Sequence, residues 1–332
     1  MSSMIDDLLN PKFLSDKTKK VSLIQTHISL VFLTDEFVYK IKKPVNFGFL
    51  DFSTLKKRHY YCHQEIMLNR RLSKDTYIDV LPILYDGKNY RMGAGKGGIV
   101  EYAVKMKRLP DEMLMKSMFF GGDLTVEHLK KIARVLARFH RTARNSLNID
   151  KFGEPEMFKI NTDENFVQIQ KYIGMTIQQR DFDTLSQWTE NFYNSNRLLF
   201  ISRINSKKIR DCHGDLHMEH ICLTENLSIF DCIEFNSRFR YTDTIADIAF
   251  LLMDLEYYGG GRLSEKLWDL YKKMANEHDV NSLLTFYKIY RAIVRGKVNS
   301  FQLDDANIVR GKKEEAKEIS SKYFKLAMSY IK

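Results

Sequence analysis

Apolar positions follow two different periodicities along this chain of 332 residues. Over the first third, apolar and polar residues tend to alternate, which is typical of β-strands, whereas helical spacing dominates afterwards. We expect strands at Ser29–Leu33 and Phe37–Lys42, separated by a polar turn. In the second of these strands, alternation places Val38, Lys40 and Lys42 on one face.

A glycine-rich segment, Gly93–Gly98, separates two further runs at Asn89–Met92 and Ile99–Met106. It resembles part of a phosphate-binding loop, but it lacks the spacing G-x-x-x-x-G-K-[ST]. Lys96 is followed by glycine rather than by the hydroxyl that would bind a metal. We therefore interpret the segment as the tip of a hairpin. The second strand leads to Lys107–Pro110, which we interpret as a hinge between two lobes.

Helical patterns cover much of the chain outside these strands. One helix is expected at Thr54–Leu72, with Asp51 or Ser53 as its N-cap. Another, Thr125–Thr142, has the apolar spacing of a buried helix, and we expect His140 to be a core histidine rather than a ligand. Further helices are expected at Asp163–Tyr172, Gln178–Asn194, Ser264–Glu277, Val280–Gln302 and Lys313–Ile331.

The stretch from Arg210 to Tyr258 carries the clearest chemical signal. Two apolar runs, Ile221–Leu223 and Leu227–Phe230, flank a polar turn and predict a hairpin. This hairpin would bring Asp215, which precedes it, and Asp231, at its far end, to the same edge. Carboxylates next to apolar strands are costly unless they have a partner. Phosphoryl transfer provides a reason for both, because one can orient a hydroxyl while the other holds a metal.

The same stretch resembles the signature of the aminoglycoside phosphotransferase family. The run His213-Gly214-Asp215-Leu216-His217, followed by Asp231, is similar to H-G-D-L-H-x-x-N and a strand ending in I-D-W or I-D-x-x-E. Asp243–Phe250 resembles the D-x-x-x-D-L-A helix start of that family. One branch, which carries the motifs H-G-D-L-x-x-E-H and D-C-x-E-F, is especially similar.

The resemblance implies an α+β, protein-kinase-like bilobal fold, with a small antiparallel-sheet N-lobe plus one helix and a large, mainly helical C-lobe. The N-lobe would span residues 1–106 and the hinge residues 107–110, where backbone groups of Lys107 and Leu109 would bind the adenine edge. The C-lobe would span residues 111–332, with a catalytic loop at 210–235 and substrate-side helices within 155–200.

By the same resemblance, Lys40 would grip the α- and β-phosphates of a nucleotide and pair with Glu65 on the following helix. Lys42 is the alternative to Lys40, and an edge-strand lysine without catalytic role is a further one. The glycine-rich loop of protein kinases is missing. Ser29, or backbone amides close to it, could contact phosphate instead.

Asp215 would be the catalytic base that orients or deprotonates the acceptor hydroxyl, and His213 would hold the loop through a backbone hydrogen bond. Asp231 would be the main ligand of Mg²⁺. Glu234 would add an outer contact to that ion or form a surface salt bridge.

His220 departs from the pattern, because aminoglycoside kinases have a metal-binding asparagine at this position. Imidazole suits Zn²⁺ or Mn²⁺ better than Mg²⁺. Three interpretations remain open: one metal is lost, a softer metal is bound by His220, or Glu219 takes the place of the asparagine.

The net charge of +10 is compatible with binding to nucleic acid, to an anionic membrane or to an anionic small substrate. The sequence has no zinc-finger spacing, basic-aromatic motif or polybasic tail, so nucleic-acid binding is not expected. Lys288, Arg291 and Arg295 form a stripe on one predicted helix. We expect this stripe to face solvent; in a cleft, it would indicate an anionic substrate.

Four cysteines lack C-x-x-C spacing, and we interpret them as small apolar core residues in a reducing cytoplasm: Cys62, Cys212, Cys222 and Cys232. The first twenty residues lack the apolar core of a signal peptide. No apolar run reaches the roughly 18 residues that a membrane span requires. We therefore expect a cytoplasmic protein, whose oligomeric state the sequence leaves open.

Together these patterns predict an ATP-dependent phosphotransferase that transfers the γ-phosphoryl group to a hydroxyl of a small molecule with Mg²⁺. GTP and Mn²⁺ are the alternatives. The alternative to this enzyme is a nucleotide-binding pseudokinase or regulatory module with little or no turnover, for which His220 and the missing glycine loop are the arguments. A kinase-like enzyme that modifies proteins is disfavoured, because no A-P-E element follows Asp231. The basic chain also argues against polycationic aminoglycosides as substrates.

Overall fold

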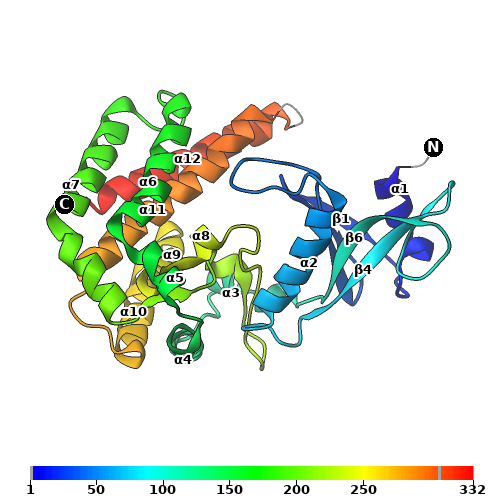
Figure 1. Ribbon diagram of the computed structural model, residues 1–332, viewed down its shortest axis with the longest axis horizontal. Coiled ribbons are helices and arrows are strands. Elements are labelled where there is room, and N and C mark those ends of the chain that lie inside the picture. Colours follow the sequence, from blue (N-terminus) through cyan, green and yellow to red (C-terminus); the bar gives the residue numbers. More distant parts are fainter. Residues whose placement is uncertain (1–2, 306–307, 332) are drawn as a thin grey trace. The chain divides into compact units, whose positions relative to one another are not determined.

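The structure, a computed structural model of the chain, describes residues 3–305 and 308–331. It divides into two compact units (Figure 1). The N-terminal unit comprises Met1–Asp123 together with Glu219–Ser237, and the helical unit comprises Leu124–Met218 together with Arg238–Lys332.

These limits differ from the predicted ones: residues 107–123 and 219–237 group with the sheet. They do so because their backbone pairs with that of the N-terminal unit. Leu114 forms a bridge with Cys222, and the Ile229 N–H donates to the carbonyl oxygen of Leu72.

The N-terminal unit is built on a six-stranded antiparallel sheet with the order β1-β2-β3-β6-β4-β5. Strands β2 and β3 have the predicted limits. The two-stranded hairpin of β8 and β9 is also as predicted. The elements of this unit are α1 (Met4–Leu8), β1 (Ser22–Gln25), β2 (Ser29–Leu33), β3 (Phe37–Lys42), α2 (Leu55–Asn69), β4 (Tyr77–Tyr85), β5 (Tyr90–Met92), β6 (Gly98–Lys107), α3 (Met115–Gly121), β8 (Ile221–Cys222) and β9 (Ser228–Ile229).

The two faces of this sheet pack against different elements. One face, with Tyr39 and Ile41 of β3, contributes to a core cluster that includes Leu8 of α1. Helix α2 packs against β4 and β6 (Figure 1), and Val38 belongs to the cluster around Cys62 of that helix. Lys40 points to the same side as Val38 and contacts α2, so the predicted division of β3 into two faces is confirmed.

The segment Gly93–Gly98 is not a hairpin tip, and this prediction was wrong. β5 and β6 both pair with β4, on opposite sides of it, so the segment crosses from one side of β4 to the other. Gly97 has φ +120°, and a Cβ there would lie 2.4 Å from the Tyr85 carbonyl oxygen. The glycines therefore serve a tight backbone crossing. Apolar runs do not reveal which strand lies between them.

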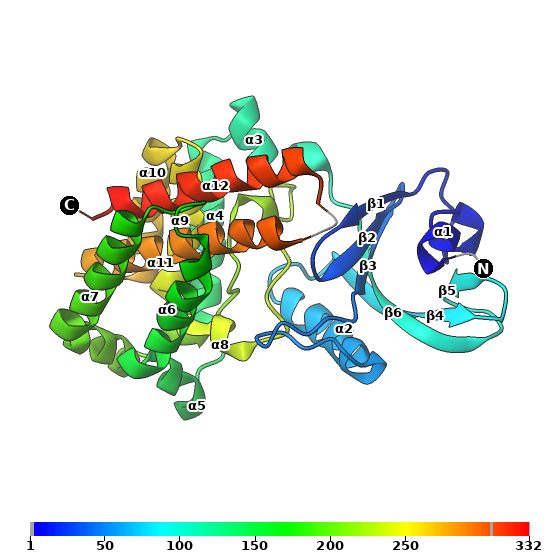
Figure 2. The same cartoon turned by 90° about the horizontal axis from the view of Figure 1, so that it is seen from above.

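The helical unit contains the long helices of the chain and one short strand pair, β7 with β10. In Figure 2, α11 and α12 run alongside one another, and these two helices are in contact. The elements are α4 (Val126–Thr142), α5 (Leu147–Asp150), α6 (Pro155–Ile169), α7 (Gln179–Asn205), β7 (Ile209–Asp211), α8 (Ser237–Arg240), β10 (Tyr241–Asp243), α9 (Thr244–Tyr257), α10 (Gly261–Ala275), α11 (Asn281–Ser300) and α12 (Arg310–Ser329).

Most helix predictions agree with the structure within a few residues, with three exceptions. The N-cap of α2 is Thr54, whose hydroxyl accepts from the Lys57 N–H at 3.3 Å, and not Asp51 or Ser53. Helix α6 begins eight residues earlier than predicted, with Pro155 in its first turn. Helix α7 runs on to Asn205 through a kink at Asn196.

No helix within residues 3–305 and 308–331 is both long enough and apolar enough to span a bilayer.

Close packing of α11 on α12 requires glycine at position 296. A Cβ at Gly296 would lie 2.8 Å from two ring carbons of Phe324. We expect Gly296→Ala to lower the free energy of unfolding by about 1–3 kcal/mol, since overpacking a buried contact displaces its neighbours. Urea denaturation measures this change. The matched control is Gly311→Ala in α12, where the new methyl group meets open space. Equal effects of the two substitutions would contradict the packing argument.

Candidate active site

The loop after β7 carries the first group of predicted residues. Gly214 has φ +88°, a conformation that glycine adopts without strain. Its neighbour His213 accepts a hydrogen bond at Nδ1 from the Asp215 backbone N–H at 3.3 Å. The predicted backbone contact of His213 is therefore present. Asp215 itself follows this turn with one third of its side chain exposed, 3.5 Å from His217 Nε2.

Two side chains of the helical core hold this loop. One accepts hydrogen bonds from its N–H groups, and the other donates to one of its carbonyl oxygens. The Asp247 carboxylate accepts from the His213 N–H at 3.0 Å and from the Gly214 N–H at 2.8 Å. Arg291 Nη1 donates to the Gly214 carbonyl oxygen at 3.0 Å and its Nε donates to the Ala246 carbonyl oxygen at 3.1 Å. The backbone before Asp215 is thus fixed by groups on α9 and α11.

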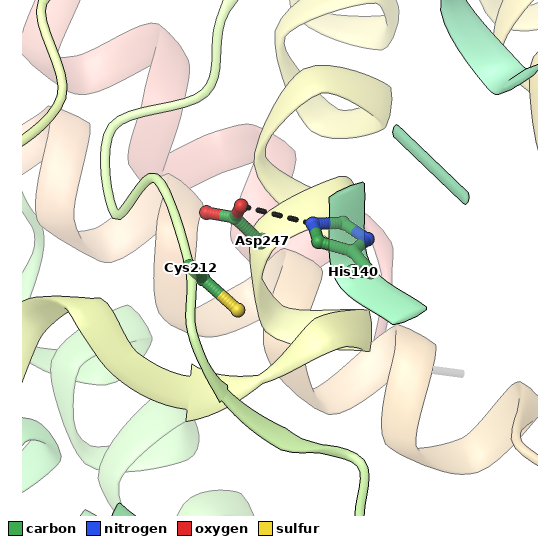
Figure 3. Close-up of side chains that lie close together, drawn as sticks. All are labelled: His140, Cys212 and Asp247. Carbon is green, nitrogen blue, oxygen red and sulfur yellow. Dashed lines mark hydrogen bonds and ion pairs between the residues drawn. The ribbon is translucent and has the colours of Figure 1, made fainter. Parts of the chain in front are cut away.

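Asp247 is fully buried and is joined to His140 across the core (Figure 3). His140 Nε2 lies 3.1 Å from the Asp247 carboxylate, and its Nδ1 lies 2.7 Å from the Tyr271 hydroxyl. His140 is therefore the satisfied core histidine that the sequence predicted. Burial raises the pKa of Asp247, but the contacts with His140 and His213 outweigh it, and the net pKa is well below its usual value.

A metal ion is a poor fit to the three side chains in Figure 3. The ligand atoms of His140, Cys212 and Asp247 lie within 4.8 Å of one another. Both imidazole nitrogens and both carboxylate oxygens, however, already have protein partners. Ligation would break these buried hydrogen bonds. All four cysteines are buried and free, as predicted.

The second group lies in the N-terminal unit, where two lysines of β3 meet three carboxylates. Lys40 Nζ pairs with Glu65 at 3.0 Å and also with Asp231. Lys42 Nζ pairs with Glu65 at 2.6 Å and also with Glu234. Glu65 is fully buried and bridges both lysines. The sequence offered the two lysines as alternative partners of Glu65, whereas both form ion pairs with it.

Electrostatics in this group favour charged lysines. Burial lowers the pKa of Lys40, but Asp231 and Glu65 outweigh it and raise that pKa well above its usual value. Burial raises the pKa of Glu65, and the two lysines together lower it below its usual value. Burial dominates at Glu234 and raises its pKa. Three carboxylates thus share two ammonium groups, and a cation would find excess negative charge here.

Asp231 is held in an unusual backbone conformation. Its φ of +62° lies in the left-handed region, which aspartate tolerates better than most residues. The Asp231 N–H donates to the Tyr77 hydroxyl at 3.1 Å, and the Cys232 N–H donates to Asn69 Oδ1 at 2.8 Å. Ser73 Oγ donates to the Ile229 carbonyl oxygen at 2.6 Å. The end of α2 and the start of β4 therefore set the direction of this carboxylate.

A divalent cation fits the donors around Asp231. His220 Nε2 lies 3.5 Å from Asp231 Oδ2, so one oxygen and one nitrogen that can ligate a cation lie close together within the N-terminal unit. Carboxylate suits Mg²⁺, and the added imidazole shifts the preference towards Mn²⁺. Glu219 forms an ion pair with Lys116 of α3. That pairing disfavours the interpretation in which Glu219 replaces the asparagine of the family.

The remaining predicted nucleotide contacts have different surroundings. Ser29 is buried opposite Lys42, and its hydroxyl has no hydrogen-bond partner among the described residues. The Lys107 N–H already donates to the Thr76 carbonyl oxygen. The backbone of Leu109, by contrast, forms no hydrogen bond with the described part of the chain. Of the two hinge residues, Leu109 is the one with backbone groups available for a ligand.

Three features of the site were missed or misread from the sequence. Glu234 is buried against Lys42 and is not a surface residue, so the surface salt bridge was wrong. Arg291 is also buried and holds the loop, so the basic stripe of α11 does not simply face solvent. Asp247 was given no role, although a carboxylate inside the apolar run Ile245–Phe250 was a usable signal.

The carboxylate of Asp247 should make a measurable contribution to stability. In Asp247→Asn, one amide oxygen replaces two acceptor oxygens, and a buried N–H of the loop loses its partner. We expect the free energy of unfolding at pH 7 to fall by about 2–4 kcal/mol. A matched control is Asp163→Asn, which removes an exposed ion pair with Lys159 and should cost less than about 1 kcal/mol.

The pH dependence gives a second test of the same substitution. Because the pKa of Asp247 is lowered in the folded state, its stabilising contribution is present above the unfolded-state pKa. It is lost as the pH falls towards the folded-state value. The difference in the free energy of unfolding between the wild type and Asp247→Asn, measured by urea denaturation, should therefore shrink from about pH 5 downwards. A difference that stays constant with pH would exclude this origin.

Comparison with other sequences gives relatives of limited coverage. Uncharacterised proteins of Mycobacterium bovis and Mycobacterium tuberculosis are 32% identical over 279 residues, which is 84% of this chain. The chain spans 54% of the length of these relatives. The model of peptidase family M54 matches residues 72–226. The chain lacks the H-E-x-x-H motif of zinc peptidases, and the matched range covers parts of both units.

Comparison with solved structures identifies the fold. Choline kinase from Cryptosporidium parvum has a TM-score of 0.53 at 12% identity, covering 94% of this chain and 88% of that one. A protein of Ralstonia eutropha assigned to the aminoglycoside phosphotransferases has a TM-score of 0.52 at 10% identity, covering 96% and 95%. Amicoumacin kinase hAmiN has a TM-score of 0.51 at 12% identity, covering 92% and 88%. The chain therefore shares the fold of these three proteins, which is the protein-kinase-like bilobal fold that its sequence motif predicted.

Proposed function

We propose that the protein is an ATP-dependent phosphotransferase that acts on a hydroxyl group of a small molecule. The observation that carries this proposal is the ion-pair group of Lys40, Glu65 and Asp231. A lysine on a strand, a glutamate on the next helix and an aspartate in a left-handed backbone conformation correspond to the parts that kinases with this fold use for phosphoryl transfer. Structural relatives that are named as kinases of choline and amicoumacin support a small acceptor.

In the proposed mechanism, Lys40 exchanges its contact with Asp231 for the phosphates of ATP, and Glu65 keeps its ammonium group in place. Asp231 and His220 would hold the divalent cation. When bound, that cation neutralises charge on the phosphate oxygens and orients them for transfer. Leu109 offers its backbone N–H and carbonyl to the adenine edge. The buried Ser29 hydroxyl is available to a phosphate oxygen.

Asp215 receives the proton of the acceptor hydroxyl. The acceptor oxygen forms a bond to the γ-phosphorus, and the bond between that phosphorus and the oxygen bridging to ADP breaks. Positioning dominates such a reaction, because its transition state is loose. The contacts of Asp247 and Arg291 with the backbone at Gly214 supply this positioning.

A nucleotide-binding protein with little turnover is the second candidate. It is favoured by one observation: Lys40 and Asp231 neutralise each other directly, so both must release a partner before they bind a nucleotide and a metal. The substitutions below separate the two candidates.

Substitution of the two aspartates should separate binding from turnover. We expect Asp231→Ala to abolish metal-dependent ATP binding in calorimetry, because it removes the carboxylate ligand. Asp215→Ala should keep ATP binding and lower the release of ADP by on the order of 10²–10⁴-fold, measured with a mixture of hydroxylated metabolites. Metal-dependent binding without any turnover in the wild type would favour the second candidate. Wild-type rates in both variants would refute the assignment of the site.

The metal preference should depend on His220. Titration of ATP with Mg²⁺ and with Mn²⁺ gives the ratio of the two affinities. We expect His220→Asn to shift this ratio towards Mg²⁺ by about tenfold or more, because an oxygen ligand replaces an imidazole. His128→Asn, at the exposed start of α4, is the matched control. If the ratio is unchanged in His220→Asn, His220 is not a ligand.

A further inference from the structure

Four cations lie along α11, and among the described residues two of them, Arg295 and Lys297, have no anionic or backbone partner. Lys288 pairs with Glu256 at 2.6 Å, and Arg291 binds two carbonyl oxygens. Arg295 Nε donates to the Tyr323 hydroxyl at 3.4 Å. Lys297 Nζ donates only to the amide oxygen of Asn165 on α6, at 2.7 Å, and no carboxylate of the described residues forms an ion pair with it.

The surroundings of Lys297 leave it short of negative charge. Burial lowers the pKa of Lys297 to about 8, while Glu164 raises it and Arg238 lowers it. Glu164 and Arg238 pair with each other at 2.6 Å. The one carboxylate that raises the pKa of Lys297 is thus already paired with an arginine, and an anion from solution would compensate Lys297.

Helix α6 presents polar atoms that lack partners on the side that holds Lys297. Asn161, Asn165 and Gln168 follow one another at helical spacing. Asn161 Oδ1, Asn165 Nδ2 and Gln168 Oε1 are buried without a hydrogen-bond partner among the described residues. A buried polar atom left without a partner costs free energy, so three such atoms on one helix indicate a bound polar molecule. Amide side chains offer both donors and acceptors, which suits a ligand with several hydroxyl groups.

A single water molecule does not explain these amides. A cavity of about 10 Å³ lies beside Asn165, enough space for one water. Apart from Asn165 and two threonines, its lining consists of Phe166, Phe286, Tyr290 and Ile293. A water there would have few polar partners. Lys297, which donates to Asn165, is only partly buried and can therefore be reached from solvent.

The same part of α11 is coupled to Asp215. Arg295, two residues before Lys297, has a raised pKa: burial lowers it, but Tyr323, Asp254 and Asp215 outweigh burial. Arg291 holds the backbone of Gly214. The last three turns of α11 thus carry both the groups that face the loop of Asp215 and the lysine that faces α6.

We propose that Lys297 and Asn165 form a subsite for an oxyanion of the acceptor, which is a small polyhydroxylated compound with a carboxylate or phosphate group. This inference rests on the proposed function, since it names the class of molecule that the phosphotransferase would modify. Lys297 and Asn165 Nδ2 donate to the oxyanion. Asn161 and Gln168 bind hydroxyl groups of the same molecule. Neutral or cationic hydroxyl compounds leave Lys297 uncompensated and are poor acceptors.

Competitive acetylation of the wild-type protein tests the subsite without requiring activity. The acetylation rate of Lys297 is measured by mass spectrometry at constant ionic strength with inorganic phosphate, with glycerate or with glycerol. We expect at least one of the two anions to slow it about fivefold at a concentration four times its dissociation constant. Glycerol should have no effect, and the rate of Lys288 should not change. Protection by phosphate alone identifies a phosphorylated acceptor, and protection by glycerate alone identifies a carboxylic acid.

Kinetics of two variants provide the second arm. For acidic acceptors that the wild type phosphorylates, Lys297→Met should raise KM about tenfold or more, as expected for loss of a charge-assisted hydrogen bond, with kcat little changed. Lys288→Met, which removes a paired cation from the same helix, should have no such effect. Absence of protection by both anions overturns the subsite. This failure is distinct from failure of the proposed function, because ATP binding is measured separately.

Discussion

A charged carboxylate inside an apolar core is the constraint on which the helical unit depends. Asp247 has no exposed surface, so its charge must be compensated by donors that the fold supplies. Two of them are N–H groups of the loop before Asp215, and the third is His140 of α4. The core is therefore stable only with the loop in this conformation, and the loop is held there by the core.

The N-terminal unit solves a similar problem with ion pairs. Glu65 lies fully buried on α2 and meets two ammonium groups that β3 presents on one face. Because Lys40 and Lys42 are two residues apart on a strand, both point to α2. The segment around Asp231 is fastened to the end of the same helix by Asn69 and Ser73. Helix α2 thus positions the lysines, the glutamate and the aspartate together.

Local patterns predicted much of this arrangement. Alternation in Phe37–Lys42 gave both lysines the correct face, and the turn at Thr224–Asn226 gave the hairpin before Asp231. The motif around Asp215 indicated the fold, which the structural comparisons confirm. These signals are local, because strand faces and turns depend on neighbouring residues.

Features that depend on distant residues were not predictable in this way. The strand order around β4 decides that Gly93–Gly98 is a crossing, and no local pattern encodes that order. Arg291 looked like a solvent residue because its partner, the Gly214 carbonyl oxygen, lies 77 residues away in the sequence. Glu234 also looked like a surface residue, because its partner, Lys42, is distant in the sequence. The roles of Asp215, Asp231 and the other site residues remain predictions.

The duplication of lysines on β3 separates two tasks that a single lysine would have to combine. Lys42 is almost fully buried and compensates Glu65 from within, whereas Lys40 is more exposed. If Lys40 exchanges its carboxylates for a phosphate, as the proposed function requires, Lys42 still balances the buried glutamate. Folding of the N-terminal unit is then independent of nucleotide. In evolution, a descendant could lose Lys40, and with it the proposed catalysis, while it keeps the architecture intact.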